Sequence, residues 1–499
     1  MKKLFITLLI LFWPSLGLAT TYHYLNCELG TGDNDGSSWA NAWQDWQEIV
    51  DDGGWAAMQS EAASQPVYLY IKKGTTCAAA DFPSSGDGIR ITGSGSSDTN
   101  RIFITVDPAD SGAKPIIDPD DAEQYGFDVR CNYVTFNGLH VRDTTNVGIN
   151  QYSVQANYIN IEDCEIDNNF RHGIYAGDST GATEPTYPHG HHWIVTRNYI
   201  HNNGDVSHTN MDHGIYTRYC DNWTVEYNKI TDNVYGYAVN PASDADDWII
   251  RYNYFENNGT SPNSGGDRGG GINVNGQGGL DCDNIKIYYN VMNNNYRGIY
   301  FNTDDGDGSG QVIIGNTIYD CQQSALTFCC TGDVPTGPDV YNNIIWTAVN
   351  YLWVLYDDTE VHASNNNNIG PAANDYIQYQ AGYYDNLNEF IAGIGGANEI
   401  SSDPLFTNAA GGDFTLQAGS LCIGAGEDLG NGLYYGLDPT STWPDNVKLL
   451  NQDDYGAWEI GAYVYIVAGP SGGPGTIVGG GSGTIAGGGS GTIVGTTPE

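Results

Sequence analysis

Positive charge is scarce in this sequence. It has 18 lysine and arginine residues against 60 aspartate and glutamate residues, a formal net charge of −42. This negative field repels nucleic acid and anionic membranes, and it repels a polyanionic substrate unless cations lie between them. The acidic excess is either an adaptation for solubility or a source of Ca²⁺ ligands, because Ca²⁺ prefers oxygen donors. We therefore expect no nucleic-acid partner, and Ca²⁺ is the one cofactor suggested.

Long apolar runs are missing after the first twenty residues, whereas a membrane-spanning helix needs roughly 20. Residues 1–19 contain two lysines, an apolar run and the small residues Gly17 and Ala19. This pattern is typical of a bacterial secretory signal peptide, cut here after Ala19. We expect an exported protein without a membrane span, either free outside the cell or associated with its surface.

Cys-x-x-Cys pairs and the His-Glu-x-x-His string are absent, which argues against zinc sites of those types. Ten cysteines in an exported chain nevertheless make disulfides possible. Cys27 and Cys77 flank the N-terminal segment and are the first pair that we expect. The adjacent Cys329 and Cys330 cannot be assigned partners from the sequence.

Short apolar runs recur between residues 130 and 345. One kind ends in Asn or Asp, as in "WTVEYN", and the other centres on glycine, as in "HGIYAG" and "HGIYTR". The two kinds alternate, and the closest copies of each are roughly 25 residues apart. Short strands at this spacing, without hairpin dipeptides between them, are typical of a coiled parallel sheet with coils about 4.8 Å apart. We therefore predict an all-β fold, a right-handed parallel β-helix.

Stacked coils would align one side chain from each coil. One predicted column is an amide ladder at a corner, formed by Asn137, Asn198, Asn228, Asn253, Asn290 and Asn316. A second predicted column, in the core, contains Ile174, Ile215, Tyr237, Ile272 and Ile299.

Two longer segments carry a family resemblance. They are "GTGDNDGSSWANAWQDWQEIV" near the N-terminus, and "SSDPLFTNAAGGDFTLQAGSLCIGAG" followed by "YGAWEIGAYVY" near the C-terminus. With the repeats, they resemble the first and closing segments of secreted right-handed β-helix proteins of the pectate-lyase-like superfamily. The resemblance covers most of the chain. It implies the architecture and no particular reaction, because members include lyases, hydrolases, epimerases and proteins without known activity.

These features predict five segments. They are a signal peptide (1–19), an N-terminal cap with a short helix (20–90), the β-helix (91–375), a closing segment (376–465) and a Gly-rich tail (466–499). The tail is either a flexible tether or a self-associating β segment. We expect a monomer.

Inserted loops indicate where a ligand would bind. Insertions at 178–192 and 303–310 follow glycine-centred strands, and insertions at 201–211 and 259–269 precede them. Two rows of loops beside one sheet make a cleft. By strand alternation, the second and fourth residues after each glycine face it. The second residues are Asn150, Tyr175, Tyr216, Ala238, Asn273 and Tyr300; the fourth are Tyr152, Gly177, Arg218, Asn240, Asn275 and Asn302.

Seven of the ten histidines lie between residues 172 and 213. Imidazole acts as an acid or base near neutral pH, or binds a transition metal. His172 and His213 share the column just before the glycine, which also contains Tyr235 and Arg297. Because an arginine in the core is improbable, a bend should expose this column to the cleft. The alternatives are a structural histidine stack and, for the "HGHH" histidines, a solvated loop.

The favoured function is β-elimination from, or C5 epimerisation of, a uronic-acid polysaccharide. Arg218, or Ca²⁺ on loop aspartates, would neutralise the carboxylate. His213 or His172 would be the base, and Tyr216 or Tyr175 the acid. Other residues predicted to bind substrate are Tyr175, Asn240, Asn273, Asn275, Tyr300 and Arg268.

Two alternatives stay open. Glycoside hydrolysis needs two carboxyl groups about 5–5.5 Å apart for retention or 6.5–9.5 Å for inversion. Asp212, which we also place among the catalytic candidates, would supply one, with Asp178, Glu184 or Asp267 as the other. The second alternative is a non-catalytic glycan-binding or structural surface protein.

Overall fold

A computed structural model describes residues 20–466, apart from the short gaps that follow. These are 84–85, 153, 178–188, 209–210, 267, 277–279, 281, 304–308, 331–337, 356–362, 372–374, 380–381, 385, 395 and 431. The predicted signal peptide and nearly all of the Gly-rich tail lie outside the described residues. No helix in the described part of the chain is long and apolar enough to cross a membrane.

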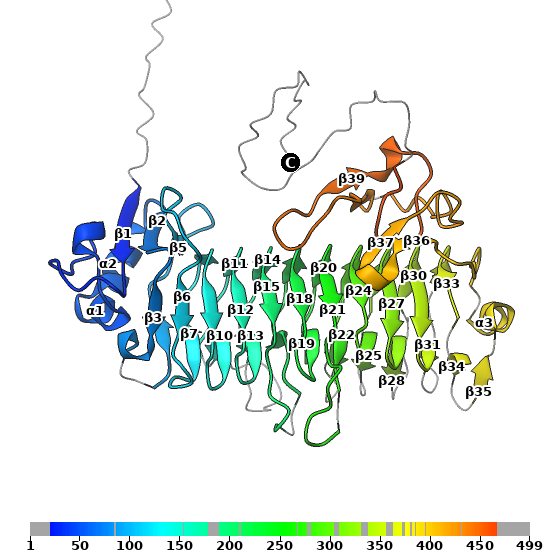
Figure 1. Ribbon diagram of the computed structural model, residues 1–499, viewed down its shortest axis with the longest axis horizontal. Helices are drawn as coiled ribbons and strands as arrows, with labels where there is room; N and C mark the ends of the chain where they lie inside the picture. Colours follow the sequence, from blue (N-terminus) through cyan, green and yellow to red (C-terminus); the bar gives the residue numbers. More distant parts are fainter. Residues whose placement is uncertain are drawn as a thin grey trace, which may run out of the picture.

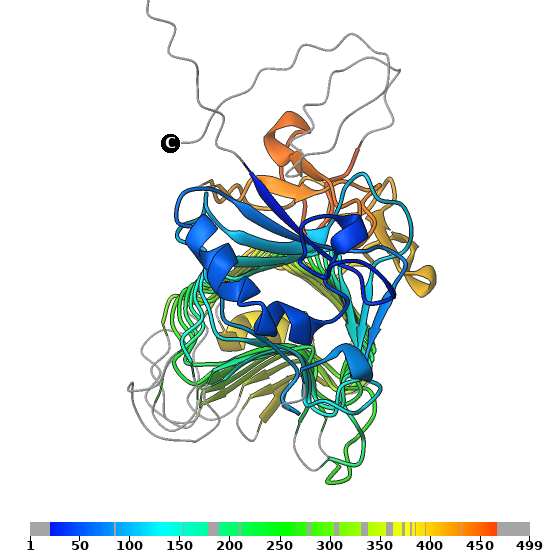
Figure 2. The same cartoon turned by 90° about the vertical axis from the view of Figure 1, so that its left-hand side faces the viewer.

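Three long sheets run the length of the described molecule, and the chain visits them in turn (Figures 1 and 2). Sheet A contains β1 (Thr21–Leu25), β2 (Val67–Ile71), β5 (Ile102–Val106), β8 (Val134–Asn137), β11 (Asn160–Glu162), β14 (Ile194–Thr196), β17 (Thr224–Glu226), β20 (Ile249–Arg251), β23 (Lys286–Tyr288), β26 (Val312–Ile314), β29 (Asp339–Tyr341) and β32 (Ala363–Asn365).

Sheet B contains β3 (Thr76–Ala78), β6 (Ile116–Asp118), β9 (His140–Arg142), β12 (Glu165–Asp167), β15 (Tyr199–His201), β18 (Lys229–Thr231), β21 (Tyr254–Glu256), β24 (Val291–Asn293), β27 (Thr317–Cys321), β30 (Ile344–Ala348) and β33 (Asn368–Ile369).

Sheet C contains β4 (Ile89–Ile91), β7 (Tyr125–Val129), β10 (Val147–Tyr152), β13 (His172–Gly177), β16 (Ile215–Arg218), β19 (Tyr237–Ala242), β22 (Gly270–Gly276), β25 (Arg297–Thr303), β28 (Ser324–Cys330), β31 (Tyr351–Leu355), β34 (Asp375–Tyr379) and β35 (Gly382–Tyr384). Neighbouring strands pair in parallel, except that β35 pairs antiparallel with β34. The predicted right-handed parallel β-helix is confirmed.

The core column of sheet C differs from the prediction at one coil. Ile174 pairs with Ile215, and Ile215 pairs with Val239 rather than Tyr237. Ile272 and Ile299 continue the column. Ala238 therefore takes the position that glycine occupies in the neighbouring coils. Tyr237, predicted to lie in the core, instead belongs to the column that contains the histidines.

The predicted amide ladder is confirmed from Asn198 onwards. Each side-chain amide donates to the amide oxygen of the next coil at 3.0 Å, through Asn228, Asn253, Asn290, Asn316, Asn343 and Asn367. Asn137 was wrongly included: it lies within β8 opposite Glu162, and its amide bonds Asp163 instead. The ladder satisfies buried polar groups at a corner where the preceding residue has a left-handed backbone, as at Arg197 (φ 55°).

Glu399 ends this ladder as its last acceptor. Its carboxylate receives the Asn367 side-chain amide at 3.1 Å and the Asn367 backbone N–H at 2.6 Å. Burial outweighs these hydrogen bonds and raises the pKa of Glu399 to about 7.

We expect Glu399 to make the folded state less stable as pH rises. Because its pKa is higher in the folded than in the unfolded chain, its contribution to stability is complete below about pH 4. It is lost as pH rises through about 7. Thermal unfolding of Glu399→Gln and the unmodified protein across this range measures the effect. The variant should gain stability relative to the unmodified protein as pH rises, and a constant difference would contradict the assignment.

The N-terminal end is closed by α1 (Trp46–Asp51) and α2 (Gly54–Glu61), within the region where a helix was predicted. The expected disulfide between Cys27 and Cys77 is present, with Cα atoms 5.2 Å apart. The β-helix begins before the boundary predicted at residue 91, because β1 to β4 already belong to the three sheets. The N-terminal segment therefore contributes both the first strands of the β-helix and the helices that cap its end.

The C-terminal segment does more than close the helix. While α3 (Leu387–Ile394) lies at the far end, the following chain folds back along the outside, away from sheet C (Figure 1). This return contains the hairpins β36 (Phe406–Asn408)–β37 (Asp413–Leu416) and β38 (Tyr435–Leu437)–β39 (Leu449–Asn451). It covers a stack of corner tyrosines, where Tyr252 and Tyr289 donate hydrogen bonds to backbone carbonyls of the return. The outer face of sheet C is left uncovered by the return.

Candidate functional site

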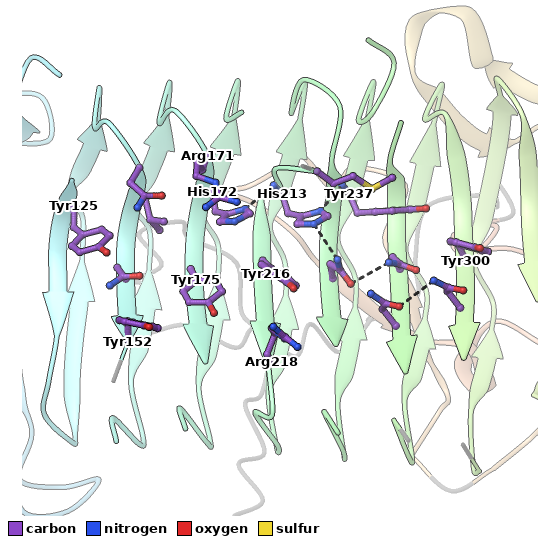
Figure 3. A pocket seen from close by; sticks show the side chains of 18 of the residues that line it. Tyr125, Tyr152, Arg171, His172, Tyr175, His213, Tyr216, Arg218, Tyr237 and Tyr300 are labelled. Atoms are coloured by element: carbon purple, nitrogen blue, oxygen red, sulfur yellow. Dashed lines mark hydrogen bonds between the residues drawn. The ribbon is translucent and has the colours of Figure 1, made fainter. Parts of the chain in front are cut away.

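A cleft of about 880 Å³ lies on the outer face of sheet C (Figure 3). Successive strands contribute side chains in three rows. The first row contains Tyr125, Val147, His172, His213, Tyr237 and Arg297; the second contains Asn150, Tyr175, Tyr216, Asn240, Asn273 and Tyr300; the third contains Tyr152, Arg218, Asn275 and Asn302. The loop-flanked sheet chosen from the sequence is therefore the sheet that carries this cleft.

The second and third rows match the predicted positions except at β19. Since Tyr216 pairs with Asn240, Asn240 lies in the second row, where Ala238 was predicted. Ala238 is fully buried. The third-row position predicted for Asn240 is taken by Ala242, which pairs with Arg218.

Two histidines and two tyrosines meet in the middle of the cleft. The rings of His172 and His213 are stacked, with centroids 5.5 Å apart and planes 5° from parallel. Tyr216 lies 4.9 Å from His213 and 5.2 Å from His172, again between ring centroids. The Tyr175 ring is 5.5 Å from that of Tyr216. Four rings able to carry a proton are thus brought together from β13 and the start of β16.

Both histidines are neutral at physiological pH. Each is 3% exposed. Burial, with a smaller contribution from the charge of Arg171, lowers the pKa of His213 to about 3. Burial and the neighbouring His213 and Arg171 lower the pKa of His172 well below its usual value. Burial also raises the pKa of Tyr216, although Arg218 and Arg171 act against that rise.

Three arginines line the cleft. Arg218 was predicted; its Nε is buried and has no hydrogen-bond partner among the described residues. Arg297 donates to the Tyr237 hydroxyl at 3.3 Å and lies 5.2 Å from the Tyr300 ring centroid. Arg171, on the edge beside His172, was missed by sequence reasoning. Among the lining residues in the described part of the chain there is no aspartate or glutamate.

Asp212 lies beneath the cleft rather than on its lining. Its side chain is 0% exposed. It accepts hydrogen bonds from Arg171 Nε at 3.3 Å, His208 Nδ1 at 2.8 Å and the Tyr235 hydroxyl at 2.9 Å. Asp212 precedes β16, and its side chain points away from the cleft toward these three partners. The carboxylate therefore holds Arg171 in position.

Arg268, another predicted binding residue, also lies behind the lining. Its guanidinium is 5.0 Å from the Tyr296 ring centroid and donates to the Thr260 carbonyl at 3.2 Å. The Arg268 carbonyl in turn accepts a hydrogen bond from Arg297 at 3.0 Å. Arg268 thus supports Arg297.

Some predicted groups are outside this cleft. Asp178, Glu184 and Asp267 lie outside the described residues. In the "HGHH" segment, the His189 ring packs against the rings of His191 and Tyr219. Neither histidine is among the lining residues.

Sequence reasoning missed Tyr125, Asn146, Met211 and the position of Tyr237 as well as Arg171. The sequence did indicate that the first row faces the cleft, because Arg297 belongs to this column and an arginine is improbable in the core. Tyr237 could be assigned to the cleft only once the register of β19 was known. Arg171, Asn146 and Met211 could be assigned only once the path of the chain just before each strand was known.

Comparisons with known proteins agree with this architecture. Residues 184–369, less than half of the chain, match the family described as "Periplasmic copper-binding protein (NosD)". No curated protein sequence matches the chain. The structure of pectate lyase Pel9A is similar with a TM-score of 0.53 at 16% identity, over 89% of this chain and 97% of that one.

Two further structures are similar at lower scores. They are a GH136 lacto-N-biosidase from Eubacterium ramulus (TM-score 0.48, 13% identity, 77% of this chain and 67% of that one) and an alginate lyase from Paenibacillus sp. (0.38, 15%, 66% and 97%). The three parallel sheets and the likeness to Pel9A show that the chain is a right-handed parallel β-helix protein.

Proposed function

We propose that this protein acts on a uronic-acid polysaccharide in the sheet C cleft, as a lyase or a C5 epimerase. One observation carries the proposal. In a chain of net charge −42, the described cleft lining combines three arginines with neutral hydrogen-bonding side chains and no carboxylate. The lining therefore reverses the sign of the surrounding field where an anionic ligand would bind.

The remaining lining suits a sugar chain. Tyrosine rings such as Tyr175 and Tyr300 offer flat apolar faces to pyranose rings, and the asparagine amides offer partners to hydroxyl groups. Strands about 4.8 Å apart place one set of such groups after another along the helix axis. Pel9A, which shares the fold, is named as a pectate lyase, which belongs to the same class of reaction.

Both reactions begin by removing the proton at C5 of a uronate. Negative charge then develops on the carboxylate, and the guanidinium of Arg218 or Arg171 would offset it. In elimination, the electron pair from C5 forms the C4–C5 double bond, the C4–O bond breaks, and the leaving oxygen takes a proton. In epimerisation, a proton returns to the opposite face of C5. His172, His213, Tyr175 and Tyr216 surround the place where these transfers would occur.

Glycoside hydrolysis has less support. It requires a pair of carboxyl groups at the substrate, and Asp212, the one described candidate, is buried against Arg171 and His208. The described lining does not suit Ca²⁺ either, because it contains three guanidinium groups, which repel the ion, and no carboxylate to offset their charge. In the described residues, no group of three or more His, Cys, Asp or Glu side chains could hold a metal ion.

Copper, named in the description of the matching family, also fits the cleft poorly. His172 and His213 both use Nδ1 to accept backbone N–H groups, and their stacked rings are 5.5 Å apart. Two ligands of one ion need nitrogens about 2 Å from it.

We also propose that the protein is exported. The lysine-initiated apolar segment at residues 1–19 and the periplasmic description of the matching family support this.

The test is incubation with pectate, alginate and neutral glycans, with and without EDTA. We expect the ultraviolet absorbance of an unsaturated uronate with one of the two acidic polymers, or C5 inversion seen by proton NMR, and no effect of EDTA. Arg218→Ala should lower kcat/KM by about 10- to 100-fold, the worth of a charge-assisted hydrogen bond. Lys286→Ala, which removes an exposed charge on sheet A, is the matched control. Reducing ends without unsaturation would instead indicate hydrolysis, and binding without turnover would indicate a glycan-binding protein.

A further inference from the structure

The protonation sites of the two cleft histidines follow from their backbone contacts. The His213 N–H donates to His172 Nδ1, and the Tyr237 N–H donates to His213 Nδ1, both at 2.9 Å. A backbone N–H can only donate, so both Nδ1 atoms must be unprotonated acceptors. A neutral imidazole then carries its one hydrogen on Nε2.

From this geometry we propose that His172 and His213 are permanent Nε2–H hydrogen-bond donors, His172 directly to the substrate carboxylate and His213 through Asn240 and Asn273, and that Tyr216, not a histidine, takes the C5 proton. The inference rests on the proposed function and assigns the roles within it. Protonation of either histidine would have to occur at Nδ1 and break its bond to the backbone. A neutral ring with Nε2–H has no lone pair to offer at the cleft.

The asparagines beyond His213 extend its hydrogen bond into a chain in which each group donates to the next. Asn240 lies 3.1 Å from His213 Nε2, and Asn273 lies 3.2 Å from Asn240 (Figure 3). A half-turn exchanges the oxygen and nitrogen of an amide without moving other atoms. Because Nε2 must donate, Asn240 presents its oxygen to His213 and its nitrogen to the Asn273 oxygen. Without this half-turn, the Asn273 oxygen has no hydrogen-bond partner among the described residues. The Asn273 nitrogen is then left for a ligand.

Other unpaired atoms on the cleft have the same character. Asn150 Nδ2 and Arg218 Nε are buried donors without a hydrogen-bond partner among the described residues, and Asn150 is 2% exposed. Such donors are costly to bury unless an acceptor arrives. Donors on β10, β16 and β22 thus point to a ligand that supplies oxygen acceptors, as the carboxylates and hydroxyls of a uronate chain do.

The tyrosine step balances without another reagent. The Tyr216 phenolate takes the C5 proton, and the electron pair passes through the enolate of the carboxylate to form the C4–C5 double bond. The C4–O bond breaks, and the Tyr216 hydroxyl returns a proton to the leaving oxygen, which regenerates the phenolate. The His172 Nε2–H and the Asn273 amide, at the end of the chain that starts at His213, hold the carboxylate while it carries the extra charge.

The phenolate requirement sets the pH dependence. The charged or titratable groups facing Tyr216 are Arg218, Arg171, Tyr219, Tyr175, His172 and His213. The two arginines favour the phenolate, while burial opposes it. Burial prevails and raises the pKa of Tyr216 above its usual value of about 10. The rate should therefore keep rising as pH increases above neutrality. A histidine base of pKa about 3 would leave the rate flat near neutrality.

Two experiments on the full chain test the assignment. Heteronuclear NMR of the imidazole nitrogens in the unmodified protein should show both rings in the Nε2–H form, without titration between about pH 5 and 8. A ring that titrates there, or that carries Nδ1–H, would overturn the proposal whatever the activity.

The second experiment compares His172→Gln with His172→Ala. Glutamine places an N–H near Nε2 and cannot act as a base, so it should keep kcat within about 10-fold of the unmodified protein. Alanine should lose about 10²- to 10³-fold, as when an oxyanion donor is removed. Equal losses in both variants would restore histidine as the base. Absence of any turnover alongside the Nε2–H form would instead refute the proposed function and leave the donor assignment standing.

Discussion

Tyr216→Phe is expected to lower kcat by about 10²- to 10⁴-fold, the usual worth of a positioned acid–base group. The phenol is the group nearest to both histidines, with its ring centroid 4.9 Å from that of His213. Phenylalanine keeps the ring and its packing while removing the proton carrier. Affinity for the polymer should change little, because Arg171, Arg218 and Arg297 are untouched.

Single-turnover kinetics with the polymer that proves to be the substrate, together with a thermal melt, measure this effect. The melt separates loss of chemistry from loss of fold. Tyr199→Phe, on sheet B and away from the cleft, is the matched control and should retain full activity. If Tyr216→Phe remains active while Tyr175→Phe is inactive, the proton carrier is Tyr175 and the assignment of Tyr216 is wrong.

Asp212→Asn is expected to destabilise the protein by about 3 kcal/mol, toward the lower end of what breaking a buried ion pair costs. The Asp212 carboxylate is fully buried and accepts from three side chains, those of Arg171, His208 and Tyr235. An amide has one oxygen and no charge, so at least one of these donors loses its partner. Because the Arg171 side chain is 35% exposed, water compensates part of the loss.

Urea denaturation of Asp212→Asn and of the control Asp232→Asn measures this cost. Asp232 is exposed on its turn and bonds only the Asn257 amide among the described contacts. The control should change stability by no more than about 0.5 kcal/mol. Released from Asp212, Arg171 should also bind the polymer less tightly, which appears as a higher KM. Equal unfolding midpoints for both variants would show that the buried network is dispensable.

The two errors in the predicted register have one physical cause. Side chains alternate with a period of two, so a two-residue shift of a strand leaves every side chain on its original face. Placing Gly236 in the glycine column preserved the alternation within β19 and put Asn240 in the third row instead of the second. It also put Tyr237 in the core column, although the bend before the strand turns this side chain toward the cleft. The same shift placed Asn137 in the ladder. The hydrophobic pattern of a sequence reveals an error of one residue in the strand register. An error of two residues is revealed only by the hydrogen-bonded pairing of the strands.

Much of the cleft was nevertheless accessible from local pattern. Tyr175, Tyr216, Asn273 and Tyr300 were placed in the second row because their strands repeat the same glycine-centred motif. The sheet was identified because insertions flank both ends of its strands. The burial of Asp212 could not be predicted in this way. The sequence around a carboxylate next to a cleft residue is the same whether the carboxylate faces solvent or a buried arginine.

The sequence by itself determined the repeating coil, because periodic apolar residues can be buried only by stacking neighbouring turns. It also determined the amide ladder and most of the tyrosine and asparagine floor. Only the tertiary structure decided the charge of the cleft, the burial of Asp212 and the protons of the two histidines. These depend on contacts between residues in different coils: Tyr237 lies 24 positions beyond the histidine ring that its backbone fixes. No pattern within one coil contains that hydrogen bond.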